Sequence, residues 1–194
     1  LPELFATGYQ FVDRKEAASL AETAQGETIA WARAMSEKIG GAICGGFAEK
    51  SEGRIFNSAF LVAPDLEPRV YRKIHLFDRE KECFDPGDGR FDICEFRGVK
   101  LGMMICFDWV FPESMRTLAI KGAQVVCHPS NLVLPFCQQA MTVRCLENAV
   151  FAVTANRTGQ EDRTADPALT FTGQSQITGP KGAILDRATA DFKA

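Results

Sequence analysis

The sequence predicts an α/β domain with mixed sheets, in which parallel and antiparallel strand pairs occur together. Short apolar runs typical of strands alternate with amphipathic helical segments, and some neighbouring runs are joined by short polar turns typical of hairpins. No internal repeat, linker or low-complexity tract divides the 194 residues, and a hydrophobic content of 46% is sufficient for a core. We therefore expect one domain over residues 1–194, while the pattern alone does not choose among α/β architectures.

The first half of the chain contains one clear amphipathic helix followed by strands. Trp31, Met35 and Ile39 are spaced by four residues, and Gly40 with Gly41 ends the helical pattern. The expected elements of this half are a helix at 28–38, strands at 42–48 and 57–63 joined by a polar hairpin loop at 49–54, a strand at 70–74, and a loop rich in Asp, Glu and Gly at 77–89.

The second half alternates strands and helices more regularly. Met115, Leu118 and Ala119 share one face of a helix that Pro112 begins. The expected elements are strands at 91–96 and 99–105, a helix at 112–121, a buried strand at 125–128, a helix at 138–148, a strand at 151–156, a polar loop at 164–170, and a final hairpin from 173–177 and 183–185.

Composition excludes several functional classes. A net charge of −3 without a basic stripe argues against nucleic-acid binding, and no apolar run reaches membrane-spanning length. The seven cysteines form no CxxC pair and only two histidines are present, so we expect no metal and no cofactor. Scattered, unpaired cysteines are typical of reduced thiols in a cytoplasmic protein.

Cys106 occupies a distinctive position. The apolar run 99–105 leads into it, and Pro112-Glu113 then begins a helix, so Cys106 lies where a strand turns towards a helix. This geometry is expected to expose the side chain and surround it with free backbone N–H groups. Cys106 is therefore a candidate nucleophile, although most free cysteines are simply small buried hydrophobes.

Two further segments favour the nucleophile. Leu1-Pro2-Glu3-Leu4-Phe5-Ala6-Thr7-Gly8-Tyr9 carries a carboxylate, and Val70-Tyr71-Arg72-Lys73-Ile74-His75-Leu76 carries a lysine within a strand-like run. With Cys106, they resemble the three signature segments of the nitrilase superfamily, the carbon–nitrogen hydrolases, in that family's order. The segments Glu80-Lys81-Glu82-Cys83-Phe84, His128-Pro129-Ser130-Asn131 and Arg144-Cys145-Leu146-Glu147-Asn148 extend the resemblance over nearly the whole chain.

The resemblance implies both a fold and a set of roles. The fold is a four-layer α-β-β-α sandwich of two mixed sheets. Cys106 would be the nucleophile, Glu3 the general base, and Lys73 with the backbone N–H of Phe107 the stabiliser of the developing negative charge. Glu80 matches the family's second glutamate, which holds the lysine and the substrate amide in place. Phe107, Trp109 and Asn131 are candidate substrate-binding residues that would line the pocket near the thiol, although Trp109 fits a core position equally well.

The leading functional prediction is a cofactor-free amidase that cleaves small amides or carbamoyl compounds. The alternatives are a nitrilase acting on aliphatic nitriles with the same residues, and a non-catalytic binding relative. A cysteine protease fits less well, since its Cys–His–Asn set would need a histidine that these supporting segments do not supply. Relatives carry a strand and a helix before Glu3 and further chain after Ala194, so we expect a truncated, poorly stable chain. We expect full-length chains to form a homodimer through the helices that flank the Cys106 sheet.

Overall fold

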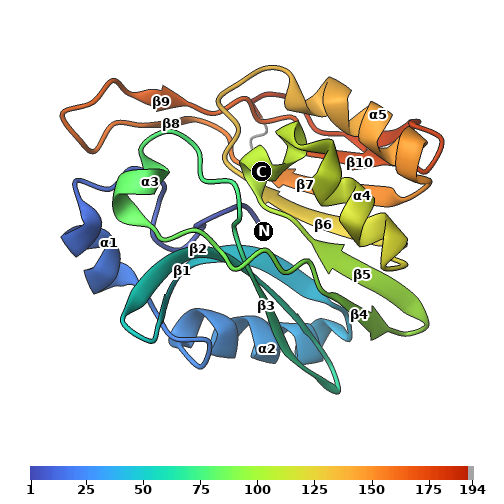
Figure 1. Cartoon of the computed structure of the whole chain (residues 1–194), viewed down its shortest axis with the longest axis horizontal. Coiled ribbons are helices and arrows are strands. Elements are labelled where there is room, and N and C mark those ends of the chain that lie inside the picture. Colours follow the sequence, from blue (N-terminus) through green and yellow to red (C-terminus); the bar gives the residue numbers. More distant parts are fainter. Residues whose placement is uncertain (192–194) are drawn as a thin grey trace.

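Two β-sheets lie face to face in the computed structural model, which describes residues 1–191 (Figure 1). Helix α2 (Glu27–Ile39) covers the outer face of one sheet, and helices α4 (Pro112–Ile120) and α5 (Cys137–Asn148) cover the outer face of the other. This arrangement is the four-layer α-β-β-α sandwich that the resemblance implies, and the fold prediction is confirmed. The last three residues of the expected domain, 192–194, lie outside the described residues.

The first sheet has three antiparallel strands in the order β1-β2-β3. Their bounds are β1 Ile43–Ser51, β2 Arg54–Ala63 and β3 Leu66–Arg72. The prediction of a polar hairpin loop at 49–54 is wrong, because both strands continue into this segment. The turn between them consists of Glu52 and Gly53 alone, both at positive φ. Glu49 stays within β1 because it is buried and receives hydrogen bonds from Ser58 and Arg72.

The second sheet has six strands in the order β11-β10-β7-β6-β5-β4, with β5, β6 and β7 parallel and the outer pairs antiparallel. Helices α4 and α5 connect the parallel strands, as parallel pairing requires. The bounds are β4 Ile93–Phe96, β5 Val99–Met103, β6 Val125–Ser130, β7 Phe151–Asn156, β10 Gln176–Thr178 and β11 Ile184–Arg187. Strands β8 (Gln160–Glu161) and β9 (Leu169–Thr170) form a separate small ladder, and β9 occupies the last two residues of the loop expected at 164–170.

Some short elements differ from the sequence prediction. Helix α1 (Arg14–Leu20) was not expected, although Asp13 caps it by accepting a hydrogen bond from the backbone N–H of Glu16. Helix α3 (Glu80–Cys83) lies within the segment expected to be a loop. A 3₁₀ helix, η1 (Cys106–Val110), occupies the predicted turn before α4.

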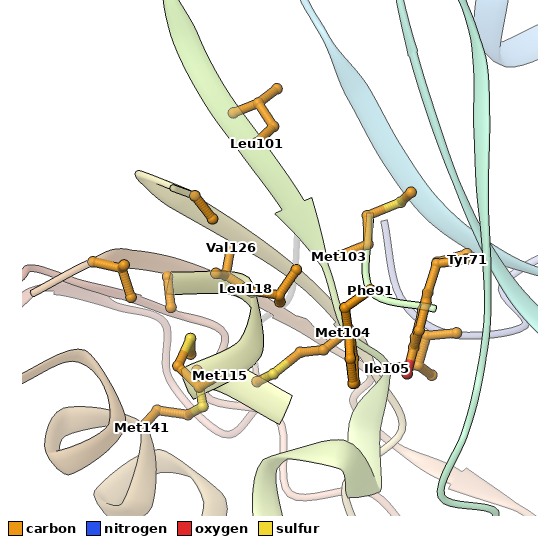
Figure 2. Close-up of a cluster of buried hydrophobic side chains, with 14 of the residues drawn as sticks. Tyr71, Phe91, Leu101, Met103, Met104, Ile105, Met115, Leu118, Val126 and Met141 are labelled. Carbon is orange, nitrogen blue, oxygen red and sulfur yellow. The ribbon is translucent and has the colours of Figure 1, made fainter. Parts of the chain in front are cut away.

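The main core fills both the space between the sheets and the space under α4 and α5. Figure 2 shows Met103 directed towards the three-stranded sheet, whereas Met104 points towards Met115 on α4. Tyr71 of β3 stacks on Phe91 with ring centroids 5.1 Å apart. Because successive residues at the end of β5 face opposite layers, the chain reaches Cys106 between two packed regions.

Candidate active site

Glu3 is held against strand β1 by the backbone. The N–H of Gly46 donates to the carbonyl of Pro2 at 2.9 Å, and the N–H of Phe5 donates to the carbonyl of Gly46 at 3.2 Å. A Cβ at position 46 would lie 2.6 Å from the Cα of Glu3, so only glycine permits this approach. The Glu3 side chain is consequently buried, with 1% of its surface exposed.

Lys73 follows the end of β3 directly, one residue outside the strand in which it was expected. Its backbone N–H donates to Asn57 of β2 at 2.9 Å, which continues the pairing for one residue. Its Nζ lies 2.7 Å from Glu3 Oε1 and 2.7 Å from Glu80 Oε1, and the whole side chain is buried. The structure therefore joins three of the predicted site residues through one ammonium group.

Glu80 and Tyr9 extend this cluster. The Tyr9 hydroxyl donates to Glu80 Oε1 at 2.5 Å, and the backbone N–H of Phe77 donates to Glu80 Oε2 at 3.2 Å. Tyr9 is the last residue of the first signature segment, but it was not predicted as a site residue. No local sequence signal indicates this contact, because Tyr9 and Glu80 are 71 positions apart in the chain.

The two carboxylate oxygens of Glu3 differ in their hydrogen bonding. Its Oε1 accepts from Lys73 and also from Asn57 Nδ2, both at 2.7 Å. Its Oε2 is buried and receives no hydrogen bond from the described residues. Since a buried carboxylate oxygen without a partner is costly, Oε2 is the atom of this cluster that is free to accept a proton or bind water.

The buried charged groups of this cluster shift one another's pKa values. Burial alone would lower the pKa of the Lys73 ammonium, but the charges of Glu3 and Glu80 outweigh it and raise that pKa, so the ammonium stays charged. Burial raises the pKa of the Glu80 carboxyl, and the neighbouring Lys73 opposes this increase without cancelling it. Burial and the charge of Glu80 raise the pKa of the Tyr9 hydroxyl, which therefore remains a donor.

Cys106 begins the 3₁₀ helix η1 with a φ of 39°, a left-handed conformation that is strained for a residue with a side chain. His128 Nε2 lies 2.9 Å from the Cys106 carbonyl oxygen, which can only accept, so this nitrogen carries the proton. Burial lowers the pKa of His128 to about 4, so the ring is neutral at neutral pH. His128 thus supports the turn through its hydrogen bond to the Cys106 carbonyl oxygen.

Asp108 connects the turn at Cys106 to the segment around Lys73 through hydrogen bonds, although it was not predicted as a site residue. Its Oδ2 accepts from the Ile105 N–H at 2.8 Å and the Tyr71 hydroxyl at 2.7 Å, while Oδ1 lies 2.7 Å from His75 Nδ1. Tyr71 and His75 flank Lys73 in sequence, so this one buried carboxylate connects the chain around Lys73 with the chain around Cys106. An acid two residues after the cysteine was the only sequence signal.

The thiol environment differs from the expectation of an exposed, activated side chain. Cys106 is only 5% exposed. Burial and the negative charge of Glu3 raise the pKa of its thiol well above the ordinary value, although Lys73 and the backbone N–H of Asn131 lower it. At rest Cys106 is therefore a neutral thiol, which needs a base before it can act as a nucleophile.

The three predicted substrate-binding residues surround a small cavity at the thiol. Phe107, Trp109 and Asn131 line it together with Cys106. The cavity volume is about 10 Å³, which is near the minimum for a single water molecule. Asn131 Nδ2 donates to the Glu3 carbonyl at 2.8 Å, whereas its buried Oδ1 receives no hydrogen bond from the described residues.

Within residues 1–191, no group of three or more His, Cys, Asp or Glu side chains is arranged to hold a metal ion. No helix there is long and apolar enough to cross a membrane.

Comparison with known proteins places the chain in one family. The family model for carbon–nitrogen hydrolases matches residues 1–193. A protein named nitrilase from Pyrococcus abyssi is 47% identical over 97% of this chain and 71% of its own length. An (R)-stereoselective amidase from Pseudomonas sp. is 37% identical over 98% of this chain and 68% of its own length. A carbon–nitrogen hydrolase structure from Helicobacter pylori superposes with a TM-score of 0.88 at 28% identity, covering 100% of this chain and 73% of the other. The chain belongs to the carbon–nitrogen hydrolase family, and it is an enzyme of that class.

Proposed function

We propose that the protein is an amidase that hydrolyses small amides or carbamoyl compounds through a thioester on Cys106 and releases ammonia. The observation that carries this proposal is the position of the Lys73 ammonium between Glu3 and Glu80, in a cluster whose charges act on the Cys106 thiol. A buried base, a buried cation and a neutral thiol are the groups that acyl transfer requires.

In the first step, Glu3 accepts the thiol proton as the Cys106 sulfur attacks the carbonyl carbon. Oε2 is the proposed acceptor, because Oε1 already receives two hydrogen bonds. Negative charge then develops on the carbonyl oxygen, where the Lys73 ammonium and the backbone N–H of Phe107 stabilise it. Since the pKa of Lys73 is raised, the ammonium keeps its charge throughout.

In the second step, the tetrahedral intermediate expels the amine. Glu3 donates its newly acquired proton to the leaving nitrogen, so ammonia departs as a neutral molecule and the thioester remains. Glu3 then removes a proton from water as the water oxygen attacks the thioester carbon. The carbon–sulfur bond breaks, the carboxylic acid leaves, and Glu3 returns the proton to the Cys106 sulfur, which restores the thiol and the carboxylate. Glu80 holds Lys73 in place and can receive a hydrogen bond from the substrate N–H₂ group.

The test is an ammonia-release assay with small amides, carbamoyl amino acids and aliphatic nitriles. We expect turnover of at least one amide or carbamoyl compound, and none by the Cys106→Ala variant with any substrate. Failure of the wild-type protein to release ammonia from any of them would overturn the proposal and favour a non-catalytic binding role.

A nitrilase activity is the second candidate, and it is favoured by the 47% identity to a protein named nitrilase. The same residues would act on a nitrile carbon, with Lys73 stabilising charge on nitrogen instead of oxygen. An amide and a nitrile with the same acyl chain discriminate the two, because an amidase prefers the amide in kcat/KM and a nitrilase prefers the nitrile.

We also propose that the protein forms a homodimer through α4 and α5. Three apolar side chains on or beside α5, Phe136, Val143 and Leu146, are 60%, 51% and 59% exposed and follow helical spacing. Light scattering should report a dimer for the wild-type protein and a monomer for Val143→Asp, with Thr142→Asp as the control. A monomeric wild-type protein would contradict this assembly. The cytoplasmic location remains a prediction.

A further inference from the structure

A larger cavity adjoins Tyr9 and Glu80 of the cluster. Its volume is about 250 Å³, and it lies between the segment 9–11, helix α3 with the loop before it, and the loop joining β8 to β9. Figure 1 shows α3 beside that loop, at the edge of the molecule that α1 also occupies. Nothing in the proposed chemistry uses this space.

The cavity and the candidate active site have residues in common. Tyr9 and Glu80 line it, and Glu80 also binds Lys73 at 2.7 Å. Phe77 lines both this cavity and the small cavity at Cys106, so the two cavities are neighbours. The Phe77 ring packs on Phe107, another residue of the small cavity, with centroids 4.9 Å apart.

Most of the surface that lines the cavity is apolar. Phe11, Phe84 and Leu169 contribute to the lining, and the rings of Phe11 and Phe84 pack edge to face with centroids 5.4 Å apart. A cavity of about 150 Å³ is enough to hold a benzene molecule. A volume of about 250 Å³ therefore accepts a group of the size of a phenyl ring or a branched alkyl chain.

Most of the charged side chains at the rim pair with each other, whereas Asp78 is exposed to solvent and forms no ion pair with another described residue. Arg79, the only cationic side chain of the lining, forms an ion pair with Asp166 across the cavity and also binds Glu82 at 3.0 Å. Its guanidinium is therefore not available to a ligand carboxylate. Glu80 is likewise occupied by Lys73 and Tyr9.

We propose that this cavity binds the non-reacting part of the substrate and selects an uncharged apolar group of about phenyl size. The inference rests on the proposed function, because it assumes that the reacting carbonyl lies at Cys106. A negatively charged group is disfavoured there, since it would lose its hydration without gaining a free cation, and a positively charged group would find only the solvent-exposed carboxylate of Asp78.

The test uses four amides that differ only at the end of a propionamide chain: propionamide itself, 3-phenylpropionamide, succinamic acid and 3-aminopropionamide. We expect kcat/KM for the phenyl compound to exceed that for propionamide by at least about tenfold, because the ring is buried. The two charged compounds should fall below propionamide. Equal or higher values for either charged compound would overturn the proposal.

The cavity is then filled by Leu169→Trp, with Leu185→Trp as the matched control because Leu185 is an exposed leucine of β11. The ratio of kcat/KM values for the phenyl compound and propionamide should fall about tenfold in Leu169→Trp, with no change in Leu185→Trp. An unchanged ratio in Leu169→Trp, with both amides still hydrolysed, contradicts the cavity assignment and leaves the amidase proposal intact.

Equilibrium binding to Cys106→Ala separates the cavity from the chemistry. By ligand-observed NMR, 3-phenylpropionamide should bind this variant about tenfold more tightly than propionamide, and the added Leu169→Trp change should remove the difference. If this pattern holds while the wild-type protein hydrolyses no amide, the cavity assignment survives and the amidase proposal fails. If the two amides bind Cys106→Ala equally, the cavity assignment fails.

Discussion

Lys73 Nζ lies 2.7 Å from Glu3 Oε1, although the two residues are 70 positions apart in the chain. Both side chains are fully buried, so this ion pair is shielded from solvent. It joins the segment along β1 to the end of β3, and Glu80 adds a second carboxylate to the same ammonium. One buried ammonium group thus forms ion pairs with two buried carboxylates.

Replacing Lys73 with Met should destabilise the protein by about 3–5 kcal/mol, because Glu3 and Glu80 would remain buried without a cation. Urea unfolding measures the change. Burial already raises the pKa of the Glu80 carboxyl, and without the opposing charge of Lys73 that pKa should rise further, so part of the lost stability should return as pH falls. The conservative control Lys73→Arg keeps the charge, and a loss of stability in Lys73→Met that does not depend on pH would contradict this account.

Glu3→Gln should separate reactivity of the thiol from turnover. The Glu3 charge raises the pKa of Cys106, so its removal should lower that pKa and increase the thiolate fraction at neutral pH. Alkylation of Cys106 by iodoacetamide should therefore become faster, while ammonia release falls by about 10²-fold or more because the proton carrier is lost. Mass spectrometry of the alkylated peptide and the ammonia assay give the two rates. Slower alkylation in Glu3→Gln would show that the carboxylate also serves as the base in that reaction.

Cys106 should be the only cysteine required for activity. Cys106→Ala should fold normally and release no ammonia, whereas the control Cys145→Ala should retain turnover and lose only about 1 kcal/mol of stability. Burial raises the pKa of Cys145 to about 12, so that thiol is inert as a nucleophile at neutral pH. Full activity of Cys106→Ala, or inactivity of a well-folded Cys145→Ala, would refute the assignment.

Tyr9→Phe should move the acidic limb of the pH profile. The Tyr9 hydroxyl donates to Glu80 and thereby lowers the pKa of that carboxyl, against the larger effect of burial. Without the hydroxyl the pKa of Glu80 rises further, so the acidic limb of kcat/KM should shift to higher pH. Tyr71→Phe, which removes a buried hydroxyl that binds Asp108, is the comparison and should leave that limb in place. An unshifted limb in Tyr9→Phe would mean that Glu80 ionisation does not control activity.

Asp108→Asn should lower kcat more than it changes KM. The carboxylate accepts from Ile105 and Tyr71 at Oδ2 and from the backbone N–H of His75 at Oδ1. The amide has an acceptor on one side only, so one of these two sets of bonds is lost and the Cys106 turn loosens relative to Lys73. A stability loss of about 1–3 kcal/mol should accompany the change. Steady-state kinetics and urea unfolding measure both effects. A pure increase in KM would indicate that Asp108 acts on substrate binding instead.

Several features could be predicted from sequence because they depend on neighbouring residues. The helix spacing of Trp31 and Met35 with the glycine stop predicted α2 within one residue at each end, and Pro112 marked the start of α4. The order of the Glu3, Lys73 and Cys106 segments indicated the family. These signals are local, so they need no knowledge of which distant segments meet.

The tertiary structure alone decided which side chains share a buried space. Glu49 looked like a loop residue, yet Arg72 and Ser58 from other strands stabilise it inside β1. Cys106 looked like an exposed, activated thiol, yet packing buries it and the Glu3 charge raises its pKa. Burial and electrostatic coupling depend on contacts between residues that are far apart in sequence. The sequence by itself therefore determined the family and the candidate groups, and only the fold determined their hydrogen bonds, their protonation and the apolar cavity beside them.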